Sequence, residues 1–230
     1  MEKMMEPYRS ADYHRIQHFI SESSWDHRAA FDDAAKDAAR FLSGFGKTGL
    51  LIDESGIEKK GESSVGVARQ YCGRVGKVTN CQIGVFGCLA AGENSALIDA
   101  RLYLPKEWIE DSPRCKKAGI PIMDQKLKTK GELALQIVKT QKEKGIKFGF
   151  VGGDAFYGHD TKLQEGIDAL GLYFMLEIHS RDKMELEPFE MELPEKKGTR
   201  GRKVKNVQVN KESTPAIGYY KSLIAKDFTK

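Results

Sequence analysis

LLIDESG, residues 50–56, places two adjacent carboxylates, Asp53 and Glu54, directly after three apolar residues. The apolar run predicts a buried strand that ends at these acids. A second stretch of the same character is KFGFVGGD, residues 147–154, which ends in Asp154. A strand that is apolar almost throughout is typical of a central strand covered on both faces. Both predicted strands therefore end in an acid, and the role of these acids is the first functional question.

A shared metal ion is one answer to that question. If the two strands lie near the middle of one sheet, Asp53 and Asp154 meet at the ends of adjacent strands, and Gly152 and Gly153 leave room for a ligand. Neighbouring buried carboxylates raise each other's pKa, and a divalent cation removes this difficulty. Oxygen ligands suit Mg²⁺ or Mn²⁺, which support phosphoryl transfer. The alternative is that each Asp only forms a turn or caps a helix.

Composition indicates a globular protein with one large domain, or one domain with appendages. The chain has 230 residues, of which 40% are hydrophobic, so it can bury a core. No apolar run approaches the ~18 residues of a membrane helix, and the N-terminus lacks the apolar segment of a secretory signal. The four cysteines form no C-x-x-C pair. This spacing argues against a zinc site or a disulfide framework and predicts buried free thiols in a reducing cytoplasm.

The order of predicted elements indicates a mixed α/β fold. Residues 11–45 predict two helices, because apolar residues recur at helical spacing and SESSWD interrupts them, with Ser23 or Ser24 as the second N-cap. An antiparallel meander follows, with strands within residues 50–53, 63–73, 80–92 and 96–105. Residues 106–131 predict an irregular loop. Helices and strands then alternate over residues 130–145, 147–154, 160–171 and 172–179, which predicts a mixed sheet with helices on its faces.

Basic residues are concentrated near the C-terminal end of the chain. The net charge of +4 is only mildly basic, but residues 194–211 carry seven Lys or Arg against one acid, Glu195. Such a block is a candidate surface for binding phosphate groups. The alternative is a solvated hairpin or tail.

Three blocks of the sequence resemble bacterial insertion-sequence transposases of the DDE superfamily. LLIDESGIEKKGESSVGVARQYCGRVGKVTNCQIGVF, residues 50–86, resembles the first catalytic block. ALIDARLYLPKEW, residues 96–108, and GDAFYG, residues 153–158, resemble the two blocks that follow it. RIQHF at residues 15–19, followed by SSWD, is similar to the region before the first block. The resemblance covers roughly residues 10–185.

The resemblance implies a fold and a pair of catalytic residues. The fold is a ribonuclease H-like mixed sheet, an antiparallel three-strand meander plus parallel strands, flanked by helices. We expect an N-terminal helical segment (1–46), a catalytic core (47–182) and the start of a basic insertion (183–230). The resemblance implies that Asp53, at the end of strand one, and Asp154, at the end of strand four, bind Mg²⁺ or Mn²⁺. The implied activity is DNA strand cleavage and transfer at the ends of a mobile element.

The resemblance also implies surfaces for DNA. We expect DNA contacts from residues beside the metal and in the basic block, namely Lys59, Lys60, Arg69, Gln70, Lys77, Asn80, Lys196, Lys197, Arg200, Arg202 and Lys203. Ordinary turn lysines are the alternative for Lys59 and Lys60. Glu54, Tyr157 and His159 are candidates for supporting roles beside the acids, with structural packing as the alternative. The implied partner is double-stranded DNA, with a possible homodimer, no membrane, and a location at the bacterial nucleoid.

The resemblance also implies a third catalytic acid, a Glu on a helix downstream of Asp154. We find no residue in this sequence that matches it. Residues 212–230 do not resemble that block, and neither Glu165 nor Glu212 stands at the expected distance. We therefore expect a truncated copy that lacks the third acidic ligand. Two alternatives remain, a non-catalytic remnant that binds DNA and a ribonuclease H-like nuclease that only hydrolyses it.

Overall fold

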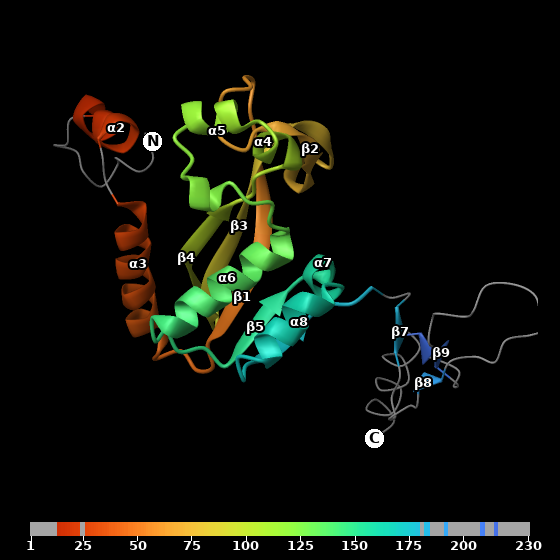
Figure 1. Ribbon diagram of the computed structural model, residues 1–230. Coiled ribbons are helices and arrows are strands. Elements are labelled where there is room, and N and C mark those ends of the chain that lie inside the picture. Colours follow the sequence, from red (N-terminus) through yellow and green to blue (C-terminus); the bar gives the residue numbers. More distant parts are fainter. Residues whose placement is uncertain are drawn as a thin grey trace, which may run out of the picture.

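A computed structural model describes residues 13–23, 26–179 and 182–184, and the two-residue strands at 191–192, 208–209 and 214–215 (Figure 1). The first half of the described chain contains α2 (Tyr13–Glu22), α3 (His27–Leu42), β1 (Gly49–Glu58), β2 (Ala68–Cys72), β3 (Lys77–Ala91) and β4 (Asn94–Leu102). The second half contains α4 (Lys106–Ile109), α5 (Ser112–Lys117), α6 (Lys130–Glu143), β5 (Phe150–Gly153), α7 (Ala155–Gly158), α8 (Thr161–Asp168) and β6 (Tyr173–Leu176). The short strands are β7 (Lys183–Met184), β8 (Met191–Glu192), β9 (Gln208–Val209) and β10 (Thr214–Pro215).

The main sheet is mixed, with strand order β2-β3-β1-β5-β6 and β4 paired to β3. β1 runs antiparallel to β3 and parallel to β5, and β5 runs parallel to β6. β2 pairs with the first residues of the long strand β3, and β4 pairs with its second half. An antiparallel meander that continues into parallel strands through helical crossovers confirms the mixed α/β prediction and is consistent with a ribonuclease H-like fold.

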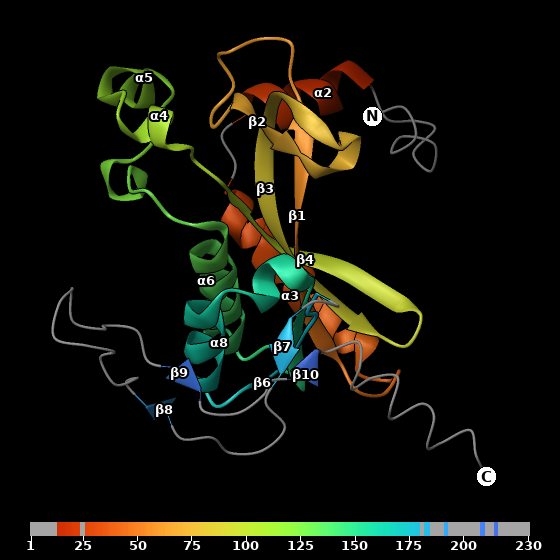
Figure 2. The same ribbon diagram turned by 90° about the vertical axis from the view of Figure 1, so that its right-hand side faces the viewer.

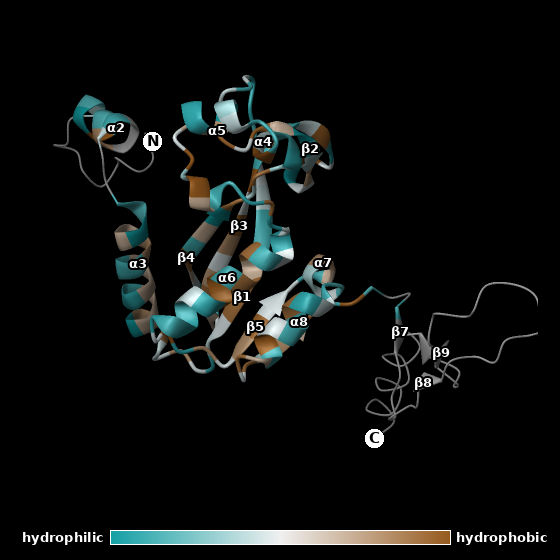
Figure 3. Ribbon diagram, viewed as in Figure 1, coloured by the Kyte–Doolittle hydropathy of each residue, from teal (hydrophilic) through white to brown (hydrophobic). Residues whose placement is uncertain are grey.

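Helices α3, α6 and α8 share one core with the sheet. Leu50 and Ile52 of β1 are buried in the same cluster as Leu42 of α3, Ile137 of α6 and Leu163 of α8. Figure 2 shows α6 and α8 lying together beside the sheet, and Figure 3 shows the apolar residues that run along β3 and α6. Burial of this apolar surface is the dominant favourable contribution to folding. None of the described helices is long and apolar enough to span a bilayer.

The opposite face of the sheet is more open than the sequence predicts. β5 is central, since it lies between β1 and β6, but the prediction that it is covered on both faces is wrong for the described residues. Gly152 stands in register between Leu51 and Met175. These two side chains remain 40% and 67% exposed. The apolar character of β5 therefore reflects its buried face and its glycines.

Two local predictions were also wrong. β1 does not end at Asp53 but continues to Glu58, because its last residues still pair with β3. Gly56 lies within the strand and permits close packing, since a Cβ there would lie 2.5 Å from the Cys72 sulfur. Asp26, not Ser23 or Ser24, caps α3 by accepting from the N–H groups of Arg28 and Ala29.

The predicted loop at residues 106–131 instead contains α4, α5 and a 3-10 turn at Ile122–Asp124. Asp111 caps α5 by accepting from Arg114 N at 2.9 Å, and proline occupies the first turn. Helices this short leave little periodicity for a sequence pattern to reveal.

The later helices begin as predicted. Thr129 and Glu132 form a capping box at the start of α6, and Asp160 is the N-cap of α8. Gly145, at φ +74°, follows α6 in the left-handed region that favours glycine. The prediction of free thiols is confirmed, with Cys72, Cys81 and Cys115 buried and Cys88 intermediate.

Candidate metal centre

Asp53 and Asp154 lie directly after paired residues of two neighbouring parallel strands. Ile52 of β1 is in register with Gly153 of β5, so the next residue of each strand is an aspartate. Paired strands lie about 4.8 Å apart, which brings these two positions together at one edge of the sheet. Both side chains are exposed to solvent. The tertiary structure therefore juxtaposes the two acids, which lie about a hundred residues apart in the chain.

Backbone N–H groups hold both carboxylates. Asp53 Oδ1 accepts from Glu54 N at 2.7 Å. Asp154 is the N-cap of α7, and its Oδ1 accepts from Phe156 N at 3.1 Å and Tyr157 N at 3.4 Å. Asp154 is therefore a helix cap, as the structural alternative proposed, and still faces the site.

The local electrostatics favour binding of a cation. Partial burial raises the pKa of Asp53, and the negative charges of Glu54 and Asp154 raise this pKa further. The Glu54 N–H and the Lys130 ammonium act in the opposite direction. A divalent cation between the carboxylates would relieve this repulsion.

Glu54 forms an ion pair behind the two aspartates. Alternation along β1 puts Asp53 on the side of exposed Leu51 and Glu54 on the side of buried Ile52. Glu54 Oε1 accepts from Lys130 Nζ, at the start of α6, at 2.8 Å. Both side chains are about one-fifth exposed, at 23% and 21%. Glu54 therefore points to the opposite face of the strand from Asp53.

Tyr157 lies next to Glu54, behind the two aspartates. Its side chain is fully buried, and its hydroxyl and Glu54 Oε2 both lack a hydrogen-bond partner among the described residues. Burial raises the pKa of Tyr157 far above its ordinary range, and the Glu54 carboxylate adds to the effect. The hydroxyl therefore stays protonated next to an acidic site.

His159 contacts Asp182 and His179, and it lines a cavity together with Asp154. Its Nε2 lies 2.7 Å from Asp182 Oδ2, and its ring packs edge-on against His179 at 4.8 Å between centroids. The hydrogen bond from His159 lowers the pKa of Asp182. A cavity of about 620 Å³ is lined by Asp154, His159, His179 and Lys162, among others. The sequence prediction missed His179, Asp182 and Lys162.

Comparison with known proteins shows the family of the chain. The family model described as DDE superfamily endonuclease matches residues 1–217. The chain belongs to the DDE superfamily of endonucleases. It is also similar to a probable transposase for insertion sequence element IS701 from Microchaete diplosiphon, at 30% identity over 176 residues. That alignment covers 75% of the chain and 42% of the relative, so the chain spans less than half the relative's length.

Asp53 and Asp154 are the candidate metal ligands of this DDE superfamily chain. Within the described ranges, no group of three or more His, Cys, Asp or Glu side chains is arranged to hold a metal ion. Two exposed carboxylates still fit Mg²⁺, which commonly keeps several waters and uses one or two carboxylates together with substrate phosphates. The donor set is hard oxygen, which excludes a zinc-like thiolate site here.

The residues predicted to bind DNA divide into two groups. Lys60, Arg69 and Lys77 are exposed and Lys59 is half-buried, so their charged groups can reach a ligand. Gln70 Nε2 instead donates to Cys81 O at 2.9 Å. Asn80 Nδ2 donates to Lys59 O and Gly61 O, both at 2.9 Å. The two amides are thus engaged with the backbone. The predicted residues of the basic block, Lys196, Lys197, Arg200, Arg202 and Lys203, lie outside the described residues.

Proposed function

We propose that this chain cuts DNA strands and transfers them at the ends of a mobile element, with Asp53 and Asp154 binding Mg²⁺ or Mn²⁺. One observation carries the proposal, namely that the two aspartates follow paired residues of adjacent strands and the charge of Asp154 raises the pKa of Asp53. Membership of the DDE endonuclease superfamily and similarity to a probable transposase support it.

Asp53 and Asp154 would bind the ion, and neighbouring residues would keep the two aspartates in position. Bound there, the cation would activate a water or a 3′-hydroxyl and neutralise charge on the reacting phosphate. The Glu54–Lys130 pair joins β1 to the start of α6, and the buried Tyr157 ring joins α7 to the core. Because these contacts fix the elements that carry both aspartates, Glu54 and Tyr157 act as positioning residues.

We propose that His159 contacts DNA rather than the metal. Asp182 holds the imidazole from one side, and the cavity that it lines also contains Asp154 and Lys162. The Lys162 ammonium lies in the same cavity as Asp154, so it would bind a phosphate of the DNA strand that is cut. Lys60, Arg69, Lys77 and the basic block at residues 196–203 would contact phosphates farther along the duplex.

A nicking assay tests the proposal. The full chain is incubated with a duplex carrying the element's end, with Mg²⁺, with Mn²⁺ or with EDTA. We expect metal-dependent nicking, reduced at least about a hundredfold in Asp53→Asn and Asp154→Asn. Asp168→Asn is the matched control, because Asp168 is exposed at the far end of α8.

The products separate this proposal from its alternatives. Nicked and joined strands support a transposase, whereas hydrolysis without joining indicates a ribonuclease H-like nuclease. DNA binding without nicking, and with Asp53→Asn equal to wild type, indicates a non-catalytic remnant. Sedimentation with and without DNA tests the proposed homodimer. The boundaries at residues 46 and 182 stay a prediction.

A further inference from the structure

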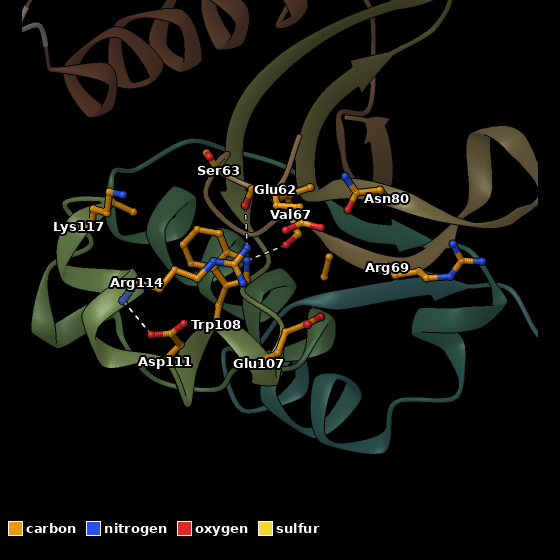
Figure 4. A pocket seen from close by; sticks show the side chains of 12 residues that line it. Glu62, Ser63, Val67, Arg69, Asn80, Glu107, Trp108, Asp111, Arg114 and Lys117 are labelled. Carbon is orange, nitrogen blue, oxygen red and sulfur yellow. Dashed lines mark hydrogen bonds between the residues drawn. The ribbon is translucent and has the colours of Figure 1, made fainter. Parts of the chain in front are cut away.

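A second cavity lies away from the aspartates, between β2 and the short helices α4 and α5. Its volume is about 710 Å³, within the range of ligand-binding sites. Figure 4 shows Arg69 at one end of it and Lys117 at the other, with Trp108 and Arg114 between them. The residues come from the predicted first block, from the end of the second block and from the segment that follows it.

Arg114 and Trp108 form a rigid stack in the middle of this cavity. Trp108 is 1% exposed, and its Nε1 donates to Val67 O at 2.7 Å. The Arg114 guanidinium lies 3.9 Å from the indole centroid, and its Nη2 donates to Glu62 O at 2.7 Å. The indole covers one face of the guanidinium and the carbonyl fixes its orientation. Arg114 also lines the cavity, so its guanidinium is a flat, charged platform in the cavity wall (Figure 4).

The charges of the lining indicate the class of ligand. In the described part of the chain, Arg69, Arg114 and Lys117 form no ion pair with any carboxylate, yet Glu62, Glu107 and Asp111 also line the cavity. A balanced lining does not favour a simple polyanion, since the carboxylates repel phosphate from the centre. It favours a ligand with a flat polar centre and anionic ends. A nucleotide within a DNA strand has this form.

We propose that this cavity receives one unpaired nucleotide of a DNA strand, with its base stacked on Arg114 and the flanking phosphates at Arg69 and Lys117. Bases stack on Arg guanidinium planes as they do on aromatic rings. A paired base has both faces covered by its neighbours in the duplex, so only an unpaired one can reach the platform. The inference rests on the proposed function, because it requires that the chain bind DNA.

Fluorescence anisotropy of labelled oligonucleotides tests the inference. Two duplexes of equal length are compared with the full chain in EDTA, one fully paired and one with a single unpaired nucleotide. We expect wild type to bind the second duplex about 5- to 100-fold more tightly, the range expected for stacking of one base. Arg114→Lys keeps the charge but removes the plane, so it should abolish this preference and leave the affinity for the paired duplex unchanged.

Two further variants act as controls for charge and folding. Arg74→Lys makes the same change at an exposed arginine of the turn that follows β2, and it should retain the preference. Arg69→Gln should weaken binding of both duplexes and reduce the salt dependence by about one phosphate contact. Far-UV circular dichroism and the unfolding midpoint confirm that each variant is folded.

The outcomes separate this inference from the proposed function. Binding to the paired duplex without any preference for the unpaired nucleotide overturns the inference and leaves DNA binding intact. An equal preference in wild type and Arg114→Lys overturns it as well. If the chain binds neither duplex, the proposed function fails together with the inference.

Discussion

Lys130 Nζ and Glu54 Oε1 lie 2.8 Å apart, although 76 residues separate them in the chain. The pair links the first residue of α6 to β1, one residue after Asp53. The same ammonium lies 5.0 Å from the centroid of Phe156, next to the Asp154 cap. One cation thus contacts a neighbour of each candidate metal ligand, Glu54 beside Asp53 and Phe156 near Asp154.

Replacing Lys130 with Met should destabilise the protein and disturb the site. Because the change leaves the largely buried Glu54 carboxylate unpaired, we expect the free energy of unfolding to fall by about 1–3 kcal/mol. Urea unfolding at pH 7 measures this loss. Lys139→Met, on the exposed side of α6, is the matched control. A loss as small as that of the control would mean that the Glu54 pair contributes no net stability.

Replacing Tyr157 with Phe should not reduce stability. The Tyr157 hydroxyl is buried without a partner among the described residues, and such a group costs about 1–3 kcal/mol relative to an apolar atom. We therefore expect the unfolding midpoint of Tyr157→Phe to equal or exceed that of wild type. Alkaline titration followed by tyrosinate absorbance should show no fewer tyrosines ionising than in wild type, since the raised pKa keeps Tyr157 protonated. A clear loss of stability would indicate a hydrogen bond to Glu54.

Asp53→Asn should stabilise the metal-free protein at neutral pH. The pKa of Asp53 is raised in the folded state from its ordinary value of 3.8, so the folded protein holds this proton more tightly than the unfolded chain. The Asp53 contribution to stability is therefore fully present below about pH 4 and is lost as pH rises through the folded pKa. The gain in unfolding free energy from Asp53→Asn should therefore appear above the folded pKa of Asp53 and vanish below about pH 4.

A metal titration complements that prediction. Mg²⁺ or Mn²⁺ that binds the folded state should raise the unfolding temperature of wild type and leave Asp53→Asn unchanged. Differential scanning calorimetry at pH 3, 5 and 7 checks both effects. If Mn²⁺ stabilises wild type and Asp53→Asn equally, Asp53 does not bind the ion.

Asp99→Ala should have the largest effect on stability. Asp99 is 1% exposed, and its carboxylate accepts from Arg28 Nη1 at 2.7 Å and Gln141 Nε2 at 3.0 Å. Arg101 Nη2 donates to it at 3.1 Å, so one carboxylate joins α3, β4 and α6. Removing it leaves the half-buried Arg28 and Arg101 without a counter-charge and Gln141 without its acceptor, at a cost of about 3 kcal/mol. Urea unfolding beside Asp168→Asn measures the difference; a loss below about 1 kcal/mol would contradict the role.

Much of the fold follows from local patterns. The apolar spacing and the following glycine of residues 130–145 predict α6, and Asp160 predicts the start of α8. β1 was predicted too short, because its apolar run stops at Ile52 while its pairing with β3 continues to Glu58. α4 and α5 are too short for periodicity to show.

The sequence by itself determined the family, the order of the longer helices and strands, and the two aspartates that are candidate metal ligands. These depend on long motifs and on residues that are near one another in the chain. Only the tertiary structure decided that Lys130 pairs with Glu54, that Asp182 holds His159, and that Arg114 stacks on Trp108. Such partners depend on how completed helices and strands pack across the core, and periodicity carries no information about those distances.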